Sequence, residues 1–288
     1  MLIDQPIPII GSIAALAGRY SAWLCDIWGV IHNGVAPFPK AVEACRTFRQ
    51  GGGVVVLITN APRPRGTIAH ILSEMGIGGD AYDAIVTSGD VTLSLLRERP
   101  GVRIFHIGPP RDEPMFEGLD VVRVQAAQAE LILNTGPYDD DNETPEDYRA
   151  LLETLSERRI PMICANPDLR VERGGKLIYC AGALAALYED LGGQVTYAGK
   201  PFAPIYELAL AEIAARLGRT LPPSQVLGIG DGLNTDIKGA HDFGMDAVYI
   251  ASQVHLESTG QDLTPSAVSK LFSAKTFRPI AAQAALAW

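Results

Sequence analysis

Short runs of almost wholly apolar residues alternate along the chain with longer segments in which apolar residues recur at helical spacing. "SAWLCDIWGV" and "GVVVLITNA" are apolar over most of their length, as is typical of strands covered by helices on both faces. Between them, Ala41, Cys45 and Phe48 fall on one face of a predicted helix that ends at a glycine. The pattern predicts an α/β protein with a Rossmann-like, mainly parallel sheet.

The same alternation continues through the middle and the C-terminal part of the chain. "RIFHIGPP", "AELILNTG" and "IPMICANPD" predict three more strands, and "QVLGIGDG" and "DAVYIA" predict two others further on. "TSGD" at residues 87–90 could cap a helix, and Thr144 followed by Pro145 marks the start of another. The final residues, "RPIAAQAALAW", predict a helix.

Composition and charge narrow the classes of function. The formal net charge of −9 over 288 residues argues against a protein that binds nucleic acid, since such proteins gather Lys and Arg against the phosphate backbone. No apolar run is long enough to span a bilayer, so we expect no membrane association. The four cysteines are scattered without a CxxC pair, which favours buried thiols and a reducing, cytoplasmic location.

Polar residues follow three of the predicted strands at the point where each strand ends. They are Asp26, Thr59 with Asn60, and Asp231 with Asp236 in "GIGDGLNTD", and Lys200 stands in "AGKP". Ligands of open α/β sheets bind outside the carboxyl ends of the strands, so these side chains are expected to converge. A carboxylate nucleophile, a hydroxyl, an ammonium and further acids are the groups that phosphoryl transfer through an aspartyl-phosphate needs. Mg²⁺ suits such an oxygen-only site.

"DIWGV", "LITN", "AGKP" and "GIGDGLNTD" resemble, in this order, the four motifs of the haloacid dehalogenase (HAD) superfamily of phosphatases. Together with "TSGD", "ANPD" and "CAGALAAL", the chain from about residue 20 to residue 255 is similar to the NagD-like class IIA branch. The resemblance implies a HAD core built from residues 1–78 and 198–288. It also implies a smaller inserted α/β cap domain of the C2 type, residues 79–197, which covers the active site and sets substrate choice.

The resemblance also assigns roles to the residues of these motifs. Asp26 would be the nucleophile and a magnesium ligand, and Thr59 would hold a phosphate oxygen through its hydroxyl. The main-chain N–H of Asn60 would help to bind the phosphate. Lys200 would neutralise the phosphate and orient Asp26. The resemblance therefore implies a phosphoric monoester hydrolase that forms an aspartyl-phosphate.

The remaining motif residues would serve the metal. Asp231 would bind Mg²⁺ directly, while Asp236 would act through water or hold the motif lysine. Trp28 would contribute its main-chain carbonyl, which any residue can supply. Most superfamily phosphatases have an aspartate at this position as the general acid and base, and an indole cannot take either role.

Three explanations for Trp28 remain open. The substrate could carry a good leaving group, as an acyl or aryl phosphate does, and need little proton donation. His32 could supply the proton, although an ordinary polar loop residue is the more common role for such a histidine. Alternatively, the protein could be a binding or regulatory protein that turns phosphate esters over weakly or not at all.

Residues outside the four motifs point to the substrate. "NPDLRV" resembles the cap loop of the branch, so Asn166, Asp168 and Arg170 are candidates for substrate contacts, and Arg63 and Arg65 could steer a phosphate ester toward the site. "GPYDDDNET" is expected to be an exposed loop rather than a second metal site. The expected substrate is a small phosphorylated metabolite, such as a sugar phosphate or a nucleotide, and the protein could form a homo-oligomer through the cap.

Overall fold

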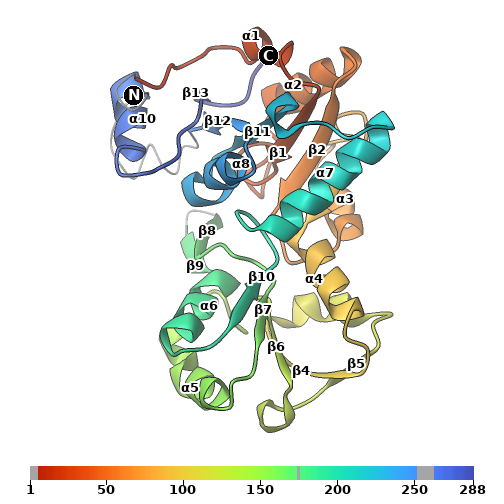
Figure 1. Ribbon diagram of the computed structural model, residues 1–288, viewed down its shortest axis with the longest axis vertical. Helices are drawn as coiled ribbons and strands as arrows, with labels where there is room; N and C mark the ends of the chain where they lie inside the picture. Colours follow the sequence, from red (N-terminus) through yellow and green to blue (C-terminus); the bar gives the residue numbers. More distant parts are fainter. Residues whose placement is uncertain (1–5, 174–175, 252–262) are drawn as a thin grey trace. The chain divides into compact units, whose positions relative to one another are not determined.

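The computed structural model describes residues 6–173, 176–251 and 263–288 (Figure 1). The chain folds into two compact units. Unit 1 comprises Met1–Thr59, Ala69–Val86 and Tyr206–Trp288, and unit 2 comprises Asn60–Ile68 and Thr87–Ile205. The cap boundaries expected at residues 79 and 197 stay a prediction.

The strands are β1 (Ala22–Asp26), β2 (Val54–Thr59), β3 (Ala84–Thr87), β4 (Val102–Ile107), β5 (Val121–Arg123), β6 (Leu131–Asn134), β7 (Met162–Cys164), β8 (Arg170–Arg173), β9 (Lys176–Tyr179), β10 (Val195–Tyr197), β11 (Val226–Gly230), β12 (Asp246–Ile250) and β13 (Ala281–Gln283). The α-helices are α1 (Ala14–Ala17), α2 (Pro39–Gln50), α3 (Arg65–Glu74), α4 (Ser88–Arg97), α5 (Arg149–Glu157), α6 (Ala181–Asp190), α7 (Ala203–Leu217), α8 (Lys238–Asp242) and α10 (Pro265–Leu271). Shorter turns include the 3₁₀ helices η1 (Pro110–Phe116) and η3 (Pro145–Tyr148) and the π-turn η5 (Leu233–Ile237).

The sheet of unit 1 has the order β13-β12-β11-β1-β2-β3. Strand β1 lies in parallel between β11 and β2, and β12 is parallel to both of its neighbours. Every residue of β1 and β2 is buried, because helices cover both faces of a parallel sheet. The predicted α/β class with a mainly parallel sheet is confirmed.

The prediction of a helix at the C-terminus is wrong. Ala281–Gln283 form the edge strand β13, in which Ala281 pairs with Val248 of β12. All three residues of β13 are buried. Alanine favours a helix in isolation, but pairing with β12 satisfies the backbone and removes these side chains from water, and tertiary context overrides a weak local propensity.

The sheet of unit 2 has the order β10-β7-β6-β4-β5, again with parallel pairing. Residues of β6 alternate between two faces. Ile132 packs with Leu152 of α5 and Leu184 of α6, whereas Leu131 packs in the cluster that contains Leu96 of α4. Figure 1 shows α5 and α6 on one side of this sheet. Unit 2 therefore has a layered α/β core of its own.

Local signals at two helix starts act as expected. Thr87 caps α4: its hydroxyl accepts from the N–H of Asp90, whose carboxylate in turn accepts from the N–H of Thr87. At Thr144, the carboxylate of Asp147 accepts from the main-chain N–H, but the first turn is the 3₁₀ helix η3 and the α-helix begins at Arg149. The antiparallel hairpin of β8 and β9 was not anticipated.

Two expectations drawn from composition concern thiols and membranes. Each of the four cysteines is buried and free of a disulfide, as predicted. Across the described ranges, the structure has no helix that combines the length and the apolar character needed to cross a bilayer.

The core of unit 1 includes a closely packed aromatic stack. Trp23 of β1 is fully buried, and its ring lies on that of Phe48 in α2 at 4.0 Å with an interplanar angle of 6°. A Cβ on Gly53 would collide with the ring of Phe48, so glycine at this position lets the chain pass beside the stack into β2.

We expect Gly53→Ala to destabilise the protein, because overpacking a filled core costs about 1–3 kcal/mol. The thermal unfolding midpoint should fall by roughly 2–8 °C. Gly66→Ala is the matched control: it changes an exposed position in α3 with no atom near the added Cβ, and should leave the midpoint equal or slightly higher. Equal midpoints for Gly53→Ala and the unmodified protein would show that the ring of Phe48 can shift to accommodate the added methyl group.

Candidate active site

Three neighbouring strands of unit 1 end in polar residues at the same edge of the sheet. Asp26 is the last residue of β1 and Thr59 the last residue of β2. Asp231 directly follows β11, which pairs with β1 on its other side. Parallel pairing brings all three strand ends to one edge, as predicted from the sequence.

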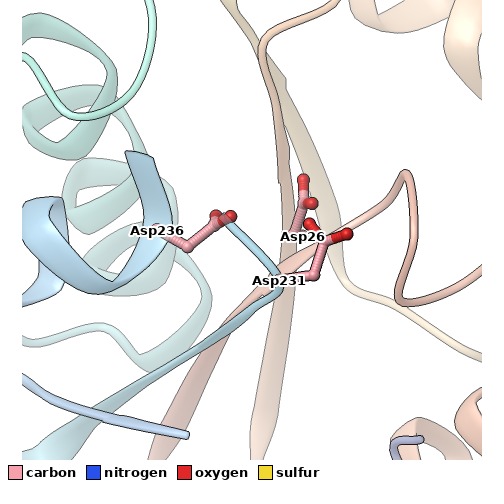
Figure 2. A group of neighbouring side chains, drawn as sticks. All are labelled: Asp26, Asp231 and Asp236. Carbon is pink, nitrogen blue, oxygen red and sulfur yellow. The ribbon is translucent and has the colours of Figure 1, made fainter. Parts of the chain in front are cut away.

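Three carboxylates gather at this edge. Asp26, Asp231 and Asp236 each offer an oxygen within 4.8 Å of the others, and Figure 2 shows the side chains on β1, on the loop after β11 and on the turn that follows. Asp26 and Asp236 are buried, and Asp231 is half-buried. Like charges at this separation repel where little water enters, and a bound cation would relieve that repulsion. An oxygen-only donor set fits a hard divalent ion such as Mg²⁺ or Ca²⁺.

Two glycines that sequence reasoning did not single out make room for these acids. Gly29 has a φ of +84°, and a Cβ there would collide with the carboxylate of Asp231. A Cβ on Gly230 would collide with the side chain of Asp236. The carboxylate of Asp236 also accepts a hydrogen bond of 3.0 Å from the N–H of Gly232. The glycines of "DIWGV" and "GIGDG" are the sequence signal that could have identified these positions, because a side chain that packs directly against the backbone requires glycine there.

The loop after β1 presents Trp28 at the surface. Its side chain is held although it is 36% exposed: the indole contacts the His32 ring edge-on at 5.5 Å, and a Cβ on Gly34 would collide with it. The tryptophan therefore occupies a defined place in the loop rather than a freely rotating one.

His32 is buried, and its surroundings favour the neutral imidazole. Its Nδ1 accepts a hydrogen bond of 2.9 Å from the N–H of Gly34, which places the proton of the neutral ring on Nε2. Burial lowers the pKa of His32 below its usual value of 6.5. The lowered pKa favours the neutral ring, which can donate one hydrogen bond through Nε2 and is a weaker acid than the imidazolium form.

In unit 2, Asn60 fixes the backbone at Lys200. The Asn60 side-chain oxygen accepts from the N–H of Lys200 at 2.7 Å, and its amide nitrogen donates to the Lys200 carbonyl at 3.2 Å. The same nitrogen donates to the carboxylate of Asp168 at 2.9 Å. Asn60 and Lys200 are both buried. Residues from the second, third and cap-loop motifs are thus brought together by one amide.

The other predicted substrate residues have structural contacts of their own. Asn166 accepts from the N–H of Asp168 at 3.0 Å and so shapes the cap loop. Arg65 pairs with Asp90, Nε to Oδ2 at 3.0 Å. Arg170 lies over the ring of Tyr179, 4.3 Å from its centroid. These contacts leave their proposed substrate roles untested.

The acidic loop of "GPYDDDNET" also brings carboxylates together, those of Asp139, Asp140 and Asp141. Arg111 pairs with Asp140, and Lys176 pairs with Asp141. The cationic side chains of Arg111 and Lys176 therefore lie at this acidic loop.

Comparisons with known proteins all indicate haloacid dehalogenase-like hydrolases. Residues 23–122 match the family model described as haloacid dehalogenase-like hydrolase, and residues 197–273 match a related HAD hydrolase-like model. The crystal structure of a hydrolase of the haloacid dehalogenase-like family from Brucella suis 1330 is 49% identical, covers 85% of this chain and 94% of its own, and superposes with a TM-score of 0.82.

Two curated relatives are more distant. Chronophin from Bos taurus is 28% identical over 279 residues, which is 87% of this chain and 90% of chronophin. The ribonucleotide monophosphatase NagD from Escherichia coli K12 is 27% identical over 237 residues, which is 80% of this chain and 87% of NagD. The similarity thus extends over both units of the chain.

Proposed function

The chain belongs to the haloacid dehalogenase-like hydrolase family, and from that premise we propose that it is a magnesium-dependent phosphatase of small phosphate monoesters. The observation that carries the proposal is the convergence of Asp26, Asp231 and Asp236, whose oxygens lie within 4.8 Å of one another at the carboxyl edge of the sheet. This arrangement supports a carboxylate nucleophile beside a divalent cation.

The metal would be held by chain oxygens. We assign Asp26 and Asp231 as direct ligands, together with the main-chain carbonyl of Trp28, and Asp236 as a ligand through water or as a partner of Lys200. When bound, Mg²⁺ would neutralise charge on the phosphate oxygens and so permit an anionic nucleophile to approach. The carboxylates of Asp26, Asp231 and Asp236 fit this ion because they are hard oxygen donors.

The chain's own residues would carry out the chemistry. The carboxylate of Asp26 attacks phosphorus, a bond forms to give an aspartyl-phosphate, and the alkoxide of the substrate departs with the electron pair. The Thr59 hydroxyl and the Asn60 main-chain N–H hold phosphate oxygens, while the Lys200 ammonium neutralises their charge. Water then attacks the aspartyl-phosphate and releases phosphate, which restores Asp26.

The second unit would govern substrate choice. We propose that residues 79–197 act as a C2-type cap and that Asn166 and Asp168 contact the substrate. The ribonucleotide monophosphatase activity in the name of NagD supports a small phosphorylated metabolite as the substrate. The four free, buried thiols support a reducing cytoplasmic location. Assembly through the cap stays a prediction.

Trp28 favours a second candidate function. Indole offers one N–H donor and no acid or base near neutral pH, and His32 beside it is held in the neutral form. A substrate with a good leaving group, such as an acyl or aryl phosphate, needs little proton donation. If only such esters react, or none at all, the protein would act mainly on acyl phosphates or as a phosphate-ligand binding protein.

We expect wild-type protein with Mg²⁺ to release phosphate in a screen of sugar phosphates, nucleotides, acyl phosphates and 4-nitrophenyl phosphate. Asp26→Asn should lose more than about 10³-fold in kcat, because the nucleophile is gone. Asp242→Asn, which removes an exposed acid of α8, is the control and should keep wild-type activity. Undiminished turnover in Asp26→Asn would overturn the mechanism.

Mg²⁺ should raise the thermal unfolding midpoint of the wild-type protein, since an ion that binds only the folded state stabilises it by about 2.7 kcal/mol at one hundred times its Kd. Asp231→Asn should lose most of this shift, whereas Asp242→Asn should keep it. The readout is calorimetric and independent of activity. An Asp231→Asn protein stabilised as strongly as the wild type would place the ion elsewhere.

Trp28→Asp should raise kcat for an alkyl phosphate, because a restored general acid and base is worth about 10²- to 10⁴-fold. The gain for 4-nitrophenyl phosphate should be smaller, since its leaving group needs little protonation. Trp28→Asn removes the same indole without supplying an acid and should give no gain. If circular dichroism shows an intact fold and Trp28→Asp still gives no gain, proton transfer is not what limits turnover.

A further inference from the structure

The backbone at Trp28 runs beside the carboxylates of unit 1. Trp28 stands two residues after Asp26, and two residues of chain span at most about 7 Å. The next residue, Gly29, is packed against Asp231, because a Cβ on this glycine would collide with that carboxylate. All four residues belong to unit 1. Any group that the Trp28 side chain contacts therefore lies close to the proposed nucleophile.

The indole of Trp28 lies on the carboxyl side of the unit 1 sheet. Its ring contacts that of His32, and its six-membered ring leaves no room for a Cβ on Gly34. Both neighbours belong to the loop that follows β1, on the side of the sheet where the carboxylates meet. The side chain is nevertheless exposed. An apolar ring is thus presented to solvent next to the candidate active site.

Hydrogen bonds within the loop fix the backbone that carries this ring. The carbonyl of Ile27 accepts from the N–H of Ile31 at 2.8 Å and from the N–H of His32 at 3.2 Å. The N–H of Gly29 donates to the carbonyl of His32 at 2.8 Å. Trp28 is therefore flanked on both sides by bonded residues. A ring that is already held in place loses little conformational freedom when a ligand packs on it.

At least one flat face of the indole has no stacked partner. The planes of the Trp28 and His32 rings meet at 74°, and a ring at this angle can cover only one face of its neighbour. Among the residues that the structure describes, no other ring contacts Trp28. Aromatic rings prefer an offset-stacked or edge-to-face partner to an aliphatic one of similar size. The open face is therefore suited to a planar aromatic group.

The acid–base chemistry of Trp28 points to the same kind of group. Indole cannot protonate a departing oxygen, so the leaving group has to be stable as an anion. An aryl oxide meets this requirement because its charge is delocalised into the ring, and that ring is planar. An alkoxide meets neither condition, and an acyl phosphate such as acetyl phosphate leaves readily but carries no ring. An aryl phosphate alone among these classes suits both properties of Trp28.

We propose that the indole of Trp28 is a stacking platform for the aromatic ring of the leaving group, and that the substrates are phosphate esters of phenolic or heteroaromatic hydroxyls. The inference rests on the proposed phosphatase function and names its substrate class. As the carboxylate of Asp26 bonds to phosphorus, the bond from phosphorus to the aryl oxygen breaks. The aryl oxide departs with the electron pair, still stacked on Trp28, and takes its proton from water afterwards.

The test compares two ligands that this chemistry cannot hydrolyse, benzylphosphonate and cyclohexylmethylphosphonate, by titration calorimetry with full-length protein and Mg²⁺. Their rings are similar in size, but only one is aromatic. Wild-type protein should bind benzylphosphonate about three- to tenfold more tightly, which is the usual gain from an aromatic pair. Trp28→Leu and Trp28→Met should bring the ratio of the two Kd values near one, and Trp28→Phe should restore part of it. Methylphosphonate, which has no ring, should bind all these proteins equally.

Trp288→Leu is the matched control, since it removes another exposed tryptophan of unit 1, one that packs near Trp23, and should leave the ratio unchanged. A wild-type ratio near one overturns the platform, and so does a ratio that Trp28→Leu or Trp28→Met retains while circular dichroism shows a folded protein. Phosphate release from esters together with equal binding of the two rings, or with binding of neither, overturns the platform alone. If no ester in the phosphate-release screen reacts, the proposed function is overturned and the leaving-group platform with it.

Discussion

The close approach of three carboxylates, those of Asp26, Asp231 and Asp236, is the constraint around which the carboxyl edge of the unit 1 sheet is built. Their oxygens lie within 4.8 Å of one another, and Asp26 and Asp236 are buried, so water screens the charges only weakly. The sheet supplies the positions, because β1 lies between β2 and β11. Glycines supply the space, because side chains at residues 29 and 230 would displace the acids. The result is an edge of the sheet at which three carboxylates lie close together.

Unit 2 uses hydrogen bonds rather than charge repulsion to arrange its polar residues. The Asn60 side chain accepts from the N–H of Lys200 and donates to the Lys200 carbonyl and to the carboxylate of Asp168. A single side chain therefore connects three motifs. A satisfied network of this kind is rigid.

Most of the strands and the candidate site could be anticipated because both rest on local patterns. Apolar runs ending in a polar residue predicted β1, β2 and β11 with Asp26, Thr59 and Asp231 at their ends. The predicted C-terminal helix failed because β12 offers Ala281–Gln283 a pairing partner that local propensity cannot foresee.

By itself, the sequence determined the fold class, the order of the motifs and the types of residue at the strand ends, since buried parallel strands and glycine-rich turns leave strong local signals. Only the tertiary structure decided which acids lie together, that Trp28 is packed against His32 in its loop, and that burial lowers the pKa of His32. The physical reason is that pKa, hydrogen-bond satisfaction and close approach depend on neighbours in space, which distant parts of the chain supply.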